Sequence, residues 1–362
     1  MALFSKTKAA ISPPPSKAAA AGGGFETGTG RAMIGAYYNY FEGDARNAAM
    51  SVPTVSRARD LIASVIGCMP LKQFSEMWNG DTMEKVPMAP RTWLRRIDPS
   101  VPNNFILSWT FDDLFFYGRA FWYITARTAD QFPTAFTRLP AAMVLTLDQA
   151  GPCWFAPSKE IQFNGNTLDP NDVVQFLSPI QGITSMSTQA VATALKLEAA
   201  RYRNASSAIP AGVLQVQAGS EPLSSTELAD LAASFNSARA TNQTAALSPE
   251  VHYLETQTSP DKMLLIDSAE FQGKEMARIC NVPLYLVGFD QGSYAYTSNE
   301  GARADLWTFG ARSYADCITS TLSQNNVLPN GTYVEFDTMN YLMGDYHDMP
   351  QVENNERVES PT

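Results

Sequence analysis

Two long helix-forming segments separated by a short insert constrain the fold of this chain more than any other feature. Residues 186–207 are rich in alanine, the residue with the highest helix propensity. Residues 260–281 form the second segment, in which Pro260 suits the first helical turn and Pro283 stops the helix just beyond its end. Whatever the rest of the chain does, its fold must accommodate two long helices joined through an intervening module.

The insert between the two helices has its own strand and helix signals. Val213–Val216 and Val251–Glu255 have the composition of strands, and Ser224 with Glu227 forms a capping box that starts a helix running from Ser225 to about Ala238. A strand–helix–strand module between two long helices is typical of a stalk with a tip. Packing of all these elements into one ordinary globular domain fits the pattern equally well.

Residues 50–180 predict an α+β domain. A helix is expected from Ser51 to about Ile66, and another from Asn103, a favourable N-cap, to Tyr117, with Gly118 as its stop. Short strands are expected at residues 71–74, 120–126, 142–147, 160–163 and 173–176.

The two ends of the chain differ from its middle. Residues 9–30 are dominated by Ala, Pro, Gly and Ser and predict a flexible arm, and the residues from about 346 onward predict a loose acidic tail. After Pro283 comes a loop that contains Gly and Tyr, then a capping box formed by Thr297 and Glu300, which opens a helix to about Leu322. The strand Tyr333–Phe336 closes the folded part.

Charge limits the classes of protein to which the chain can belong. The net charge is −10, with 12 basic and 8 acidic residues among the first 100 but 3 and 11 among the last 80. Tight binding of nucleic acid needs clustered Lys and Arg, so this balance argues against it. An acidic surface suits DNA that must slide past without sticking, and it equally suits a protein that is simply soluble. The most hydrophobic stretch, residues 105–124, holds three charges, which argues against a membrane span.

Signs of catalysis are scarce in the sequence. The two histidines, His252 and His347, have no metal-binding spacing, and no glycine-rich phosphate loop follows a strand, so no metal, nucleotide or other cofactor is expected. Asp112 and Asp113 are adjacent in a predicted helix and therefore point about 100° apart, which favours a solvated helix face over a metal site. The four cysteines are predicted to be buried free thiols: Cys68, Cys153, Cys280 and Cys317.

The segment from Leu247 to Leu306 carries a specific resemblance. It contains a helix, a Val-Pro turn, a Ser/Tyr-rich loop and an Asn-Glu pair that opens the next helix, at these positions: Glu275, Met276, Ala277, Arg278, Ile279, Val282, Pro283, Leu286, Gly288, Asn299 and Glu300. This pattern resembles the portal proteins of siphovirus-type tailed double-stranded DNA phages. Residues 56–67, followed by Pro70-Leu71, are similar to the first helix and strand of that family. Gly301 departs from the family, whose members usually carry a larger, helix-favouring residue there.

The resemblance implies a portal fold of the α+β class. Its parts would be an arm at residues 1–49, an α/β wing at 50–185, a stem helix at 186–207, a small α/β clip at 208–259, a second stem helix at 260–282, the tunnel-loop region at 283–299, a long helix with the terminal strand at 300–340, and an acidic tail at 341–362.

The resemblance also implies a structural role and no enzymatic one. Portal proteins form a ring, usually a dodecamer, at one vertex of the capsid, assembled in the host cytoplasm and retained in the virion without contact to a membrane. Double-stranded DNA passes through the ring, which meets the large subunit of terminase, a head–tail connector or adaptor, and the major capsid protein. The alternatives are another head–tail connector ring protein and a metal-dependent DNA-processing enzyme, which would need clustered carboxylates.

In this family the tunnel loop, here residues 288–298 and the start of the following helix, projects toward the DNA. The residues expected in or beside the channel are Asp290, Gln291, Gly292, Ser293, Tyr294, Tyr296, Asn299 and Glu300. The segment from Gly288 to Glu300 has no basic residue, and a conduit needs weak contact with phosphate. The two tyrosines would touch the duplex or pack between neighbouring subunits, and the acidic residues would keep the lumen negative.

Overall fold

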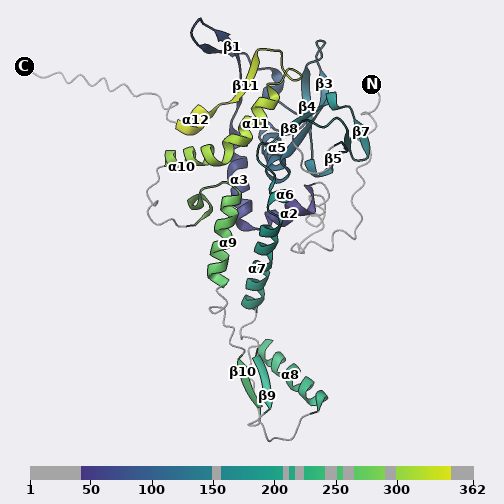
Figure 1. The fold of residues 1–362 in the computed structure, drawn as a ribbon, viewed down its shortest axis with the longest axis vertical. Helices are drawn as coiled ribbons and strands as arrows, with labels where there is room; N and C mark the ends of the chain where they lie inside the picture. The colour runs from purple at the N-terminus through teal and green to yellow at the C-terminus, as the bar shows by residue number, and fades with distance from the viewer. Residues whose placement is uncertain are drawn as a thin grey trace, which may run out of the picture. The chain divides into compact units, whose positions relative to one another are not determined.

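The computed structural model describes residues 42–148, 156–206, 212–216, 224–240, 251–255, 265–289 and 299–343. The chain divides into two compact units, one formed by Met1–Thr188 with Ala277–Thr362 and the other by Gln189–Met276 (Figure 1). The second unit is therefore an insertion in the first, and it contains most of both long helices with the module between them. Mixed helix and strand in both units confirm the α+β class.

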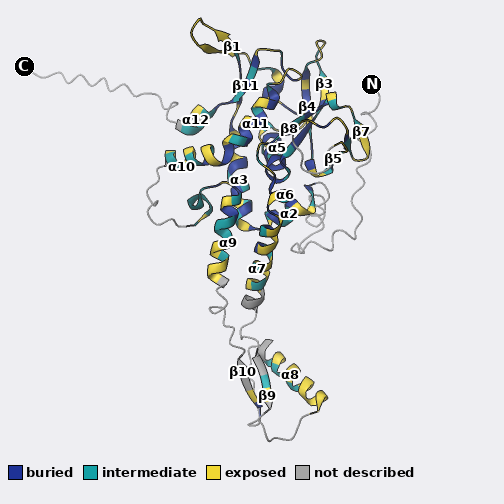
Figure 2. Ribbon diagram, in the orientation of Figure 1, coloured by how far each residue is buried: buried dark blue, intermediate teal, exposed yellow. Residues whose placement is uncertain are grey.

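Two helices, α3 (Pro53–Cys68) and α5 (Asn103–Tyr117), pack against each other in the larger unit. Pro53 occupies the first turn of α3, and Val55, Ala58, Ile62 and Ile66 bury one face of it at helical spacing. Because α5 is apolar nearly all round, it lies in the interior (Figure 2).

The ends of α5 show one correct and one wrong prediction. Gly118 ends the helix in the left-handed conformation with φ 72°, and its N–H donates to the carbonyl of Leu114 at 2.9 Å. Asn103, however, is not the N-cap: Pro102 holds that position. The Asn103 amide instead accepts from the N–H of Ile97 and donates to the carbonyl of Leu94, both at 2.8 Å, so it fixes the preceding loop.

An antiparallel sheet covers α5, with strand order β4-β3-β8: Pro133–Leu139, Arg119–Arg127 and Val173–Leu177. Phe136 and Phe176 pack on the indole of Trp122, all of them fully buried, and the Trp122 indole N–H donates to Thr110 Oγ1 of α5 at 2.8 Å. The sequence predicts β3 and β8 but not β4, which begins at a proline. Three very short strands form a second sheet, in the order β5-β6-β7: Val144–Thr146, Ile161–Phe163 and Asn166–Leu168.

A third sheet has the order β11-β1-β2 and joins distant parts of the chain. Strand β1 (Leu71–Trp78) pairs with β11 (Thr332–Phe336) on one side and with β2 (Met83–Met88) on the other, all antiparallel. β1 extends beyond the predicted residues 71–74 because the hairpin partner β2 continues its ladder. All six residues of β2 are exposed.

The helix after residues 290–298 begins at Asn299 and ends at Leu322, close to its predicted bounds. It consists of α10 (Asn299–Asp305), a π-helical segment η6 (Leu306–Ala311) and α11 (Arg312–Leu322), which buries Tyr314, Ile318 and Leu322. The remaining short helices of this unit are α2 (Asp44–Met50), α4 (Thr92–Arg95), α6 (Ile183–Met186) and α12 (Thr338–Met343), with short 3-10 turns η3 (Ala141–Met143), η4 (Pro170–Asp172) and η5 (Leu284–Val287). Helix α12 was not predicted, and it extends beyond residue 341, where the tail was expected to start.

The smaller unit contains the predicted elements in the predicted order. Two helices, α7 (Thr188–Ser206) and α9 (Leu265–Ile279), lie side by side in Figure 1, and Gln272 Nε2 on α9 donates to the carbonyl of Ala190 on α7 at 3.1 Å. Strands β9 (Gly212–Val216) and β10 (Val251–Glu255) pair antiparallel, and α8 spans Ser225–Ala240. The capping box is confirmed: the backbone N–H of Ser224 donates to the Glu227 carboxylate at 2.8 Å, and the N–H of Glu227 donates to Ser224 Oγ at 3.4 Å.

A buried ionic cluster overturns the prediction of a solvated face at Asp112 and Asp113. Both side chains are fully buried. Asp112 accepts from Arg46 at 2.9 and 3.0 Å and from Arg59 at 2.6 Å, whereas Asp113 accepts from Arg138 at 2.7 and 2.8 Å. The two carboxylates point to different partners, as adjacent helical positions require, and each binds arginine.

The cluster has equal numbers of carboxyl and guanidinium groups and is organised around one indole. Glu42 also accepts from Arg138, at 2.9 and 3.1 Å, so three carboxylates face three guanidinium groups. The guanidinium carbons of Arg46, Arg59 and Arg138 lie 5.0, 5.1 and 5.0 Å from the ring centroid of Trp109. Burial works against the charge of Arg138, but Asp113 and Glu42 outweigh it and raise the pKa of the guanidinium, which stays charged.

The cluster also moves the end of the predicted arm. Residues 1–49 were expected to be flexible, but Glu42 and Arg46 are buried and bind the larger unit through Arg138 and Asp112. The folded unit therefore begins no later than Glu42. Cys68 is a second correction: its thiol is exposed, whereas Cys280 and Cys317 are buried as predicted, and Cys153 lies outside the described residues.

Candidate loop base at residues 275 to 305

The motif that carries the family resemblance begins on helix α9. Met276 and Ala277 are fully buried, whereas Glu275 and Ile279 are half-buried and Arg278 is exposed. The helix ends at Ile279. The motif therefore combines packing residues with polar ones on one helix.

A compact turn connects α9 to the loop. The N–H of Val282 donates to the carbonyl of Ala277 at 3.1 Å, and the Val282 side chain is buried. Pro283 precedes the 3-10 turn η5, which contains half-buried Leu286 and packs against α3. Gly288 then takes φ 93°, a conformation that strains any residue with a Cβ. The motif glycine is thus required by the backbone at the end of η5.

A hydrogen bond joins the chain on the two sides of residues 290–298. Tyr285 in η5 donates its hydroxyl to Asp305 Oδ2 in α10 at 2.9 Å. Burial and the neighbouring Asp305 carboxylate raise the pKa of Tyr285 to about 12, so the phenol remains a donor at any physiological pH. We call Tyr285 and Asp305, together with the turn η5 and the helix α10 that carry them, the loop base.

The helix beyond the loop rests on α3 through a small residue. Gly310 in the π-helical segment is buried, and a Cβ there would lie 3.3 Å from two side-chain carbons of Ile62. Both ends of the loop therefore contact the same helix, α3, through η5 on one side and η6 on the other. This geometry holds the loop ends at a fixed separation.

The structure describes only some of the residues that are predicted to lie in or beside the channel. Asp290, Gln291, Gly292, Ser293, Tyr294 and Tyr296 lie outside the described residues, as does Thr297 of the predicted capping box. Asn299 opens α10, and Glu300 is exposed on its first turn. The acidic lumen and the role of the two tyrosines stay predictions.

Sequence reasoning missed Tyr285, Asp305 and Gly310, which do most to fix the loop base. The only available signal was an isolated glycine inside a strong helical pattern, at residue 310, which often marks close packing. Nothing in the spacing of Tyr285 and Asp305 predicts their contact, because it forms across a loop.

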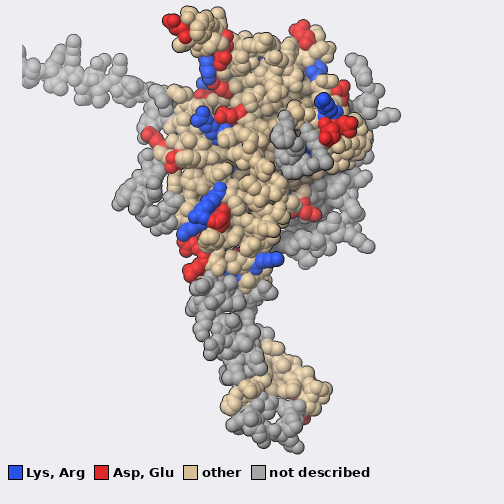
Figure 3. Space-filling view, viewed as in Figure 1, with Lys and Arg blue, Asp and Glu red and all other residues tan. Residues whose placement is uncertain are grey.

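Charge and metal-ligand geometry limit the chemistry of the described residues. On the face shown in Figure 3, acidic and basic side chains are interspersed and form no basic stripe. Within the described ranges no three His, Cys, Asp or Glu side chains are grouped to hold a metal ion. His252 is exposed on β10. No helix among the described residues has the length and apolar character that crossing a bilayer requires.

Replacing Tyr285 by phenylalanine tests the loop base. Loss of the bond to Asp305 is expected to lower the free energy of unfolding by about 1 kcal/mol and to speed amide exchange at residues 299–305. Hydrogen–deuterium exchange with mass spectrometry measures the second effect. Tyr333→Phe is the matched control, because the Tyr333 ring stacks on Phe74 and its hydroxyl makes no hydrogen bond among the described residues. Equal exchange at residues 299–305 in both variants would contradict the role of Tyr285.

Comparison with known proteins defines the class and then the family. The fold is shared with an HK97-family phage portal protein from Corynebacterium diphtheriae, with 20% identity, a TM-score of 0.65, and 82% of this chain and 96% of that chain covered. It is also shared with a chain in the virion of a native gene transfer agent particle, at 14% identity, TM-score 0.57 and 82% and 83% coverage. A chain in the neck of the native particle computed with C12 symmetry matches at 14% identity, TM-score 0.54 and 89% and 88% coverage.

These likenesses show that the fold, an α+β fold with a strand–helix–strand module between two long helices in this chain, is shared with those proteins. The family "phage portal protein" matches residues 53–352 of the sequence. The chain belongs to the phage portal protein family, which confirms the resemblance seen at residues 247–306. No curated protein matches the chain.

Proposed function

We propose that the protein is the structural subunit of a ring at one vertex of a phage capsid, through which double-stranded DNA enters and leaves. The observation that carries the proposal is the family match over residues 53–352, together with the same order of elements in the described units. In this assignment residues 50–185 with β11 are the wing, α7 and α9 the stem, residues 208–259 the clip and residues 288–298 the tunnel loop. The role is structural and not catalytic.

Similarity to a solved assembly supports a particular number of subunits in the ring. A similar chain belongs to a particle neck computed with C12 symmetry, which supports twelve copies here. Twelve chains of 39.6 kDa give an assembly of about 475 kDa. Native mass spectrometry of the purified protein should show one closed species near that mass. Only monomers and dimers, over a range of concentration and salt, would contradict the proposal.

The composition of the tunnel loop supports a conduit. Residues 288–300 contain no Lys or Arg, and Glu300 is exposed at the end of the segment. Each Lys or Arg that contacts a phosphate raises the affinity of the ring for the duplex and makes this affinity depend on salt. Such contacts would slow a sliding duplex. A negative or neutral loop avoids both effects.

A basic residue in the loop is expected to make the ring bind duplex DNA more tightly. Asp290→Lys in the assembled ring should raise the affinity for duplex DNA. The negative slope of the logarithm of the binding constant against the logarithm of salt concentration should become steeper by about 0.9 for each phosphate contact. Titration of the ring with labelled duplex at several salt concentrations measures this. The control is Asp81→Lys on the β1–β2 hairpin, an equal change in charge outside the loop. Equal binding by both variants would contradict the assignment of residue 290 to the channel.

The partners follow from the same assignment. The clip, residues 208–259, would dock the large subunit of terminase during packaging and a head–tail connector or adaptor afterwards, and the wing would meet the major capsid protein. The protein would assemble in the host cytoplasm and remain in the virion. A different head–tail connector ring is disfavoured by the portal family match over most of the chain.

A further inference from the structure

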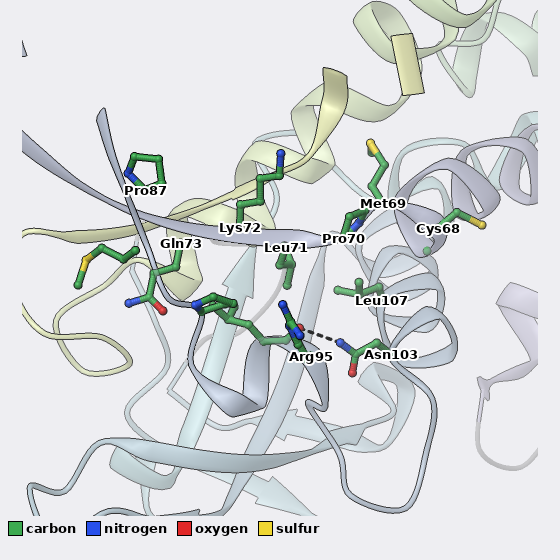
Figure 4. Close-up of a pocket in the computed structure, with 14 residues that line it drawn as sticks. Cys68, Met69, Pro70, Leu71, Lys72, Gln73, Pro87, Arg95, Asn103 and Leu107 are labelled. Atoms are coloured by element: carbon green, nitrogen blue, oxygen red, sulfur yellow. Dashed lines mark hydrogen bonds between the residues drawn. The ribbon is translucent and has the colours of Figure 1, made fainter. Parts of the chain in front are cut away.

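A groove lies at the base of the β1–β2 hairpin. It has a volume of about 670 Å³ and is bounded by the start of β1, the end of β2, α4 and the start of α5 (Figure 4). Met69, Leu71, Leu94 and Leu107 give it an apolar lining, and Met88 at its rim is exposed. The groove belongs to the larger unit and is separate from the loop base.

The charge of the groove is opposite to that of the chain. Its charged lining residues are Lys72 and Arg95, and no carboxylate lines it, whereas the whole chain carries a net charge of −10. Lys72 pairs with Asp337 at 2.7 Å. Arg95 has no ion pair among the described residues, and Figure 4 shows it between Gln73 of β1 and Asn103 of α5. An apolar lining with one uncompensated guanidinium suits a peptide that carries both aliphatic and acidic side chains.

One segment of this chain has that composition and follows α12, the helix directly after Asp337, which pairs with Lys72 of the groove. Residues 344–362 contain five acidic residues and a single Arg, with aliphatic side chains at Met349, Val352 and Val358. Asp337, the partner of Lys72, is followed directly by α12, and a helix of that length spans only about 9 Å. Nineteen extended residues reach about 60 Å, so the groove is within their range.

We propose that residues 344–362 dock in this groove of their own chain, with a carboxylate on Arg95 and an aliphatic side chain against the exposed Met88. The segment covers apolar surface that the described residues leave open beside the edge strand β2. The groove and the segment belong to one subunit, so their contact does not depend on the number of subunits in the ring or on the path of DNA.

Cys68 is exposed and lines the α3 end of the groove, with its sulfur pointing away from Leu71 and Arg95 (Figure 4), so its alkylation reports on a segment that extends along the whole groove. Deletion of residues 344–362 should raise the rate of Cys68 alkylation by a maleimide about tenfold, as expected when a docked segment covers the thiol about nine-tenths of the time. Peptide mapping by mass spectrometry reads Cys68 separately from the other cysteines. A synthetic peptide of residues 344–362 should restore the slow rate. Equal rates in the full and truncated chains would overturn the proposal.

A pair of charge reversals tests the recognition. Arg95→Glu in the full-length chain should give the fast rate of the truncated protein, because the acidic segment is then repelled. Arg57→Glu reverses an exposed arginine on α3 outside the groove and should leave Cys68 protected. Protection that survives Arg95→Glu would overturn the role of charge and with it the proposal.

A disulfide cross-link identifies which copy supplies the segment. With Cys153→Ser and Val352→Cys, mild oxidation should join residues 68 and 352 within one chain, which runs as a monomer on a non-reducing gel and yields the linked peptide in mass spectrometry. A ladder of cross-linked dimers and larger species would show that a neighbouring copy fills the groove, and would overturn docking within the chain.

Discussion

Asp112→Asn is expected to lower the free energy of unfolding by about 3–5 kcal/mol, the usual cost of removing one partner from a buried ion pair. Asp112 is fully buried and accepts hydrogen bonds from both Arg46 and Arg59. Asparagine keeps the volume but removes the charge, and it leaves the Arg46 guanidinium buried against Trp109 without its carboxylate. Chemical denaturation followed by tryptophan fluorescence measures the change in midpoint and slope.

The control for Asp112→Asn uses the same arginine. Asp60 pairs with Arg59 at 3.0 Å, but its side chain is 59% exposed, so Asp60→Asn should cost less than about 1 kcal/mol. Because both variants remove one carboxylate from Arg59, the difference isolates burial. Similar losses in the two variants would contradict a cluster that holds α2 on α5.

Gly182→Ala is expected to destabilise the fold by about 3 kcal/mol, the upper end of the usual range for overpacking. A Cβ at residue 182 would lie 2.2 Å from the carbonyl oxygen of Phe116 and 2.5 Å from the carbonyl carbon of Tyr117. These are backbone atoms at the end of α5, so no side chain can rotate away. The neighbouring Thr184 also donates to the Phe116 carbonyl, at 2.6 Å, which ties α6 to the same helix end.

Gln181→Ala is the matched control for Gly182→Ala, because Gln181 is exposed and one residue away. It should change the free energy of unfolding by no more than about 0.5 kcal/mol. Thermal and urea denaturation of both variants and of the parent protein measure the two changes in the free energy of unfolding. A Gly182→Ala variant as stable as Gln181→Ala would mean that α5 and α6 separate more easily than their contact implies.

The parts of the fold that were predicted correctly depend on neighbouring residues. The capping box at Ser224, the proline at the start of α3 and the glycine at the end of α5 act within one turn of helix, so sequence alone reveals them. The same holds for the strand–helix–strand order of the insert. Local chemistry also explains Gly288, because its positive φ ends the turn before the loop.

The wrong predictions depend on contacts between distant residues. Asp112 meets Arg46 across 66 positions, and an acidic pair on a helix has the same local pattern whether it faces water or arginine. Strands β2 and β4 contain or begin with proline, which weakens a strand pattern, and they form because their neighbours offer a free edge. The loop base was missed for the same reason, since Tyr285 and Asp305 meet only after the chain returns to α3.

Negative-stain electron microscopy of the purified full-length protein tests the central claim most directly. Class averages along the particle axis should show closed rings, twelvefold by analogy with the similar neck structure, around a hole wide enough for duplex DNA. Compact monomers or dimers without a central hole, persisting across protein and salt concentrations, would contradict the assignment of this chain as the subunit of a DNA-conducting ring.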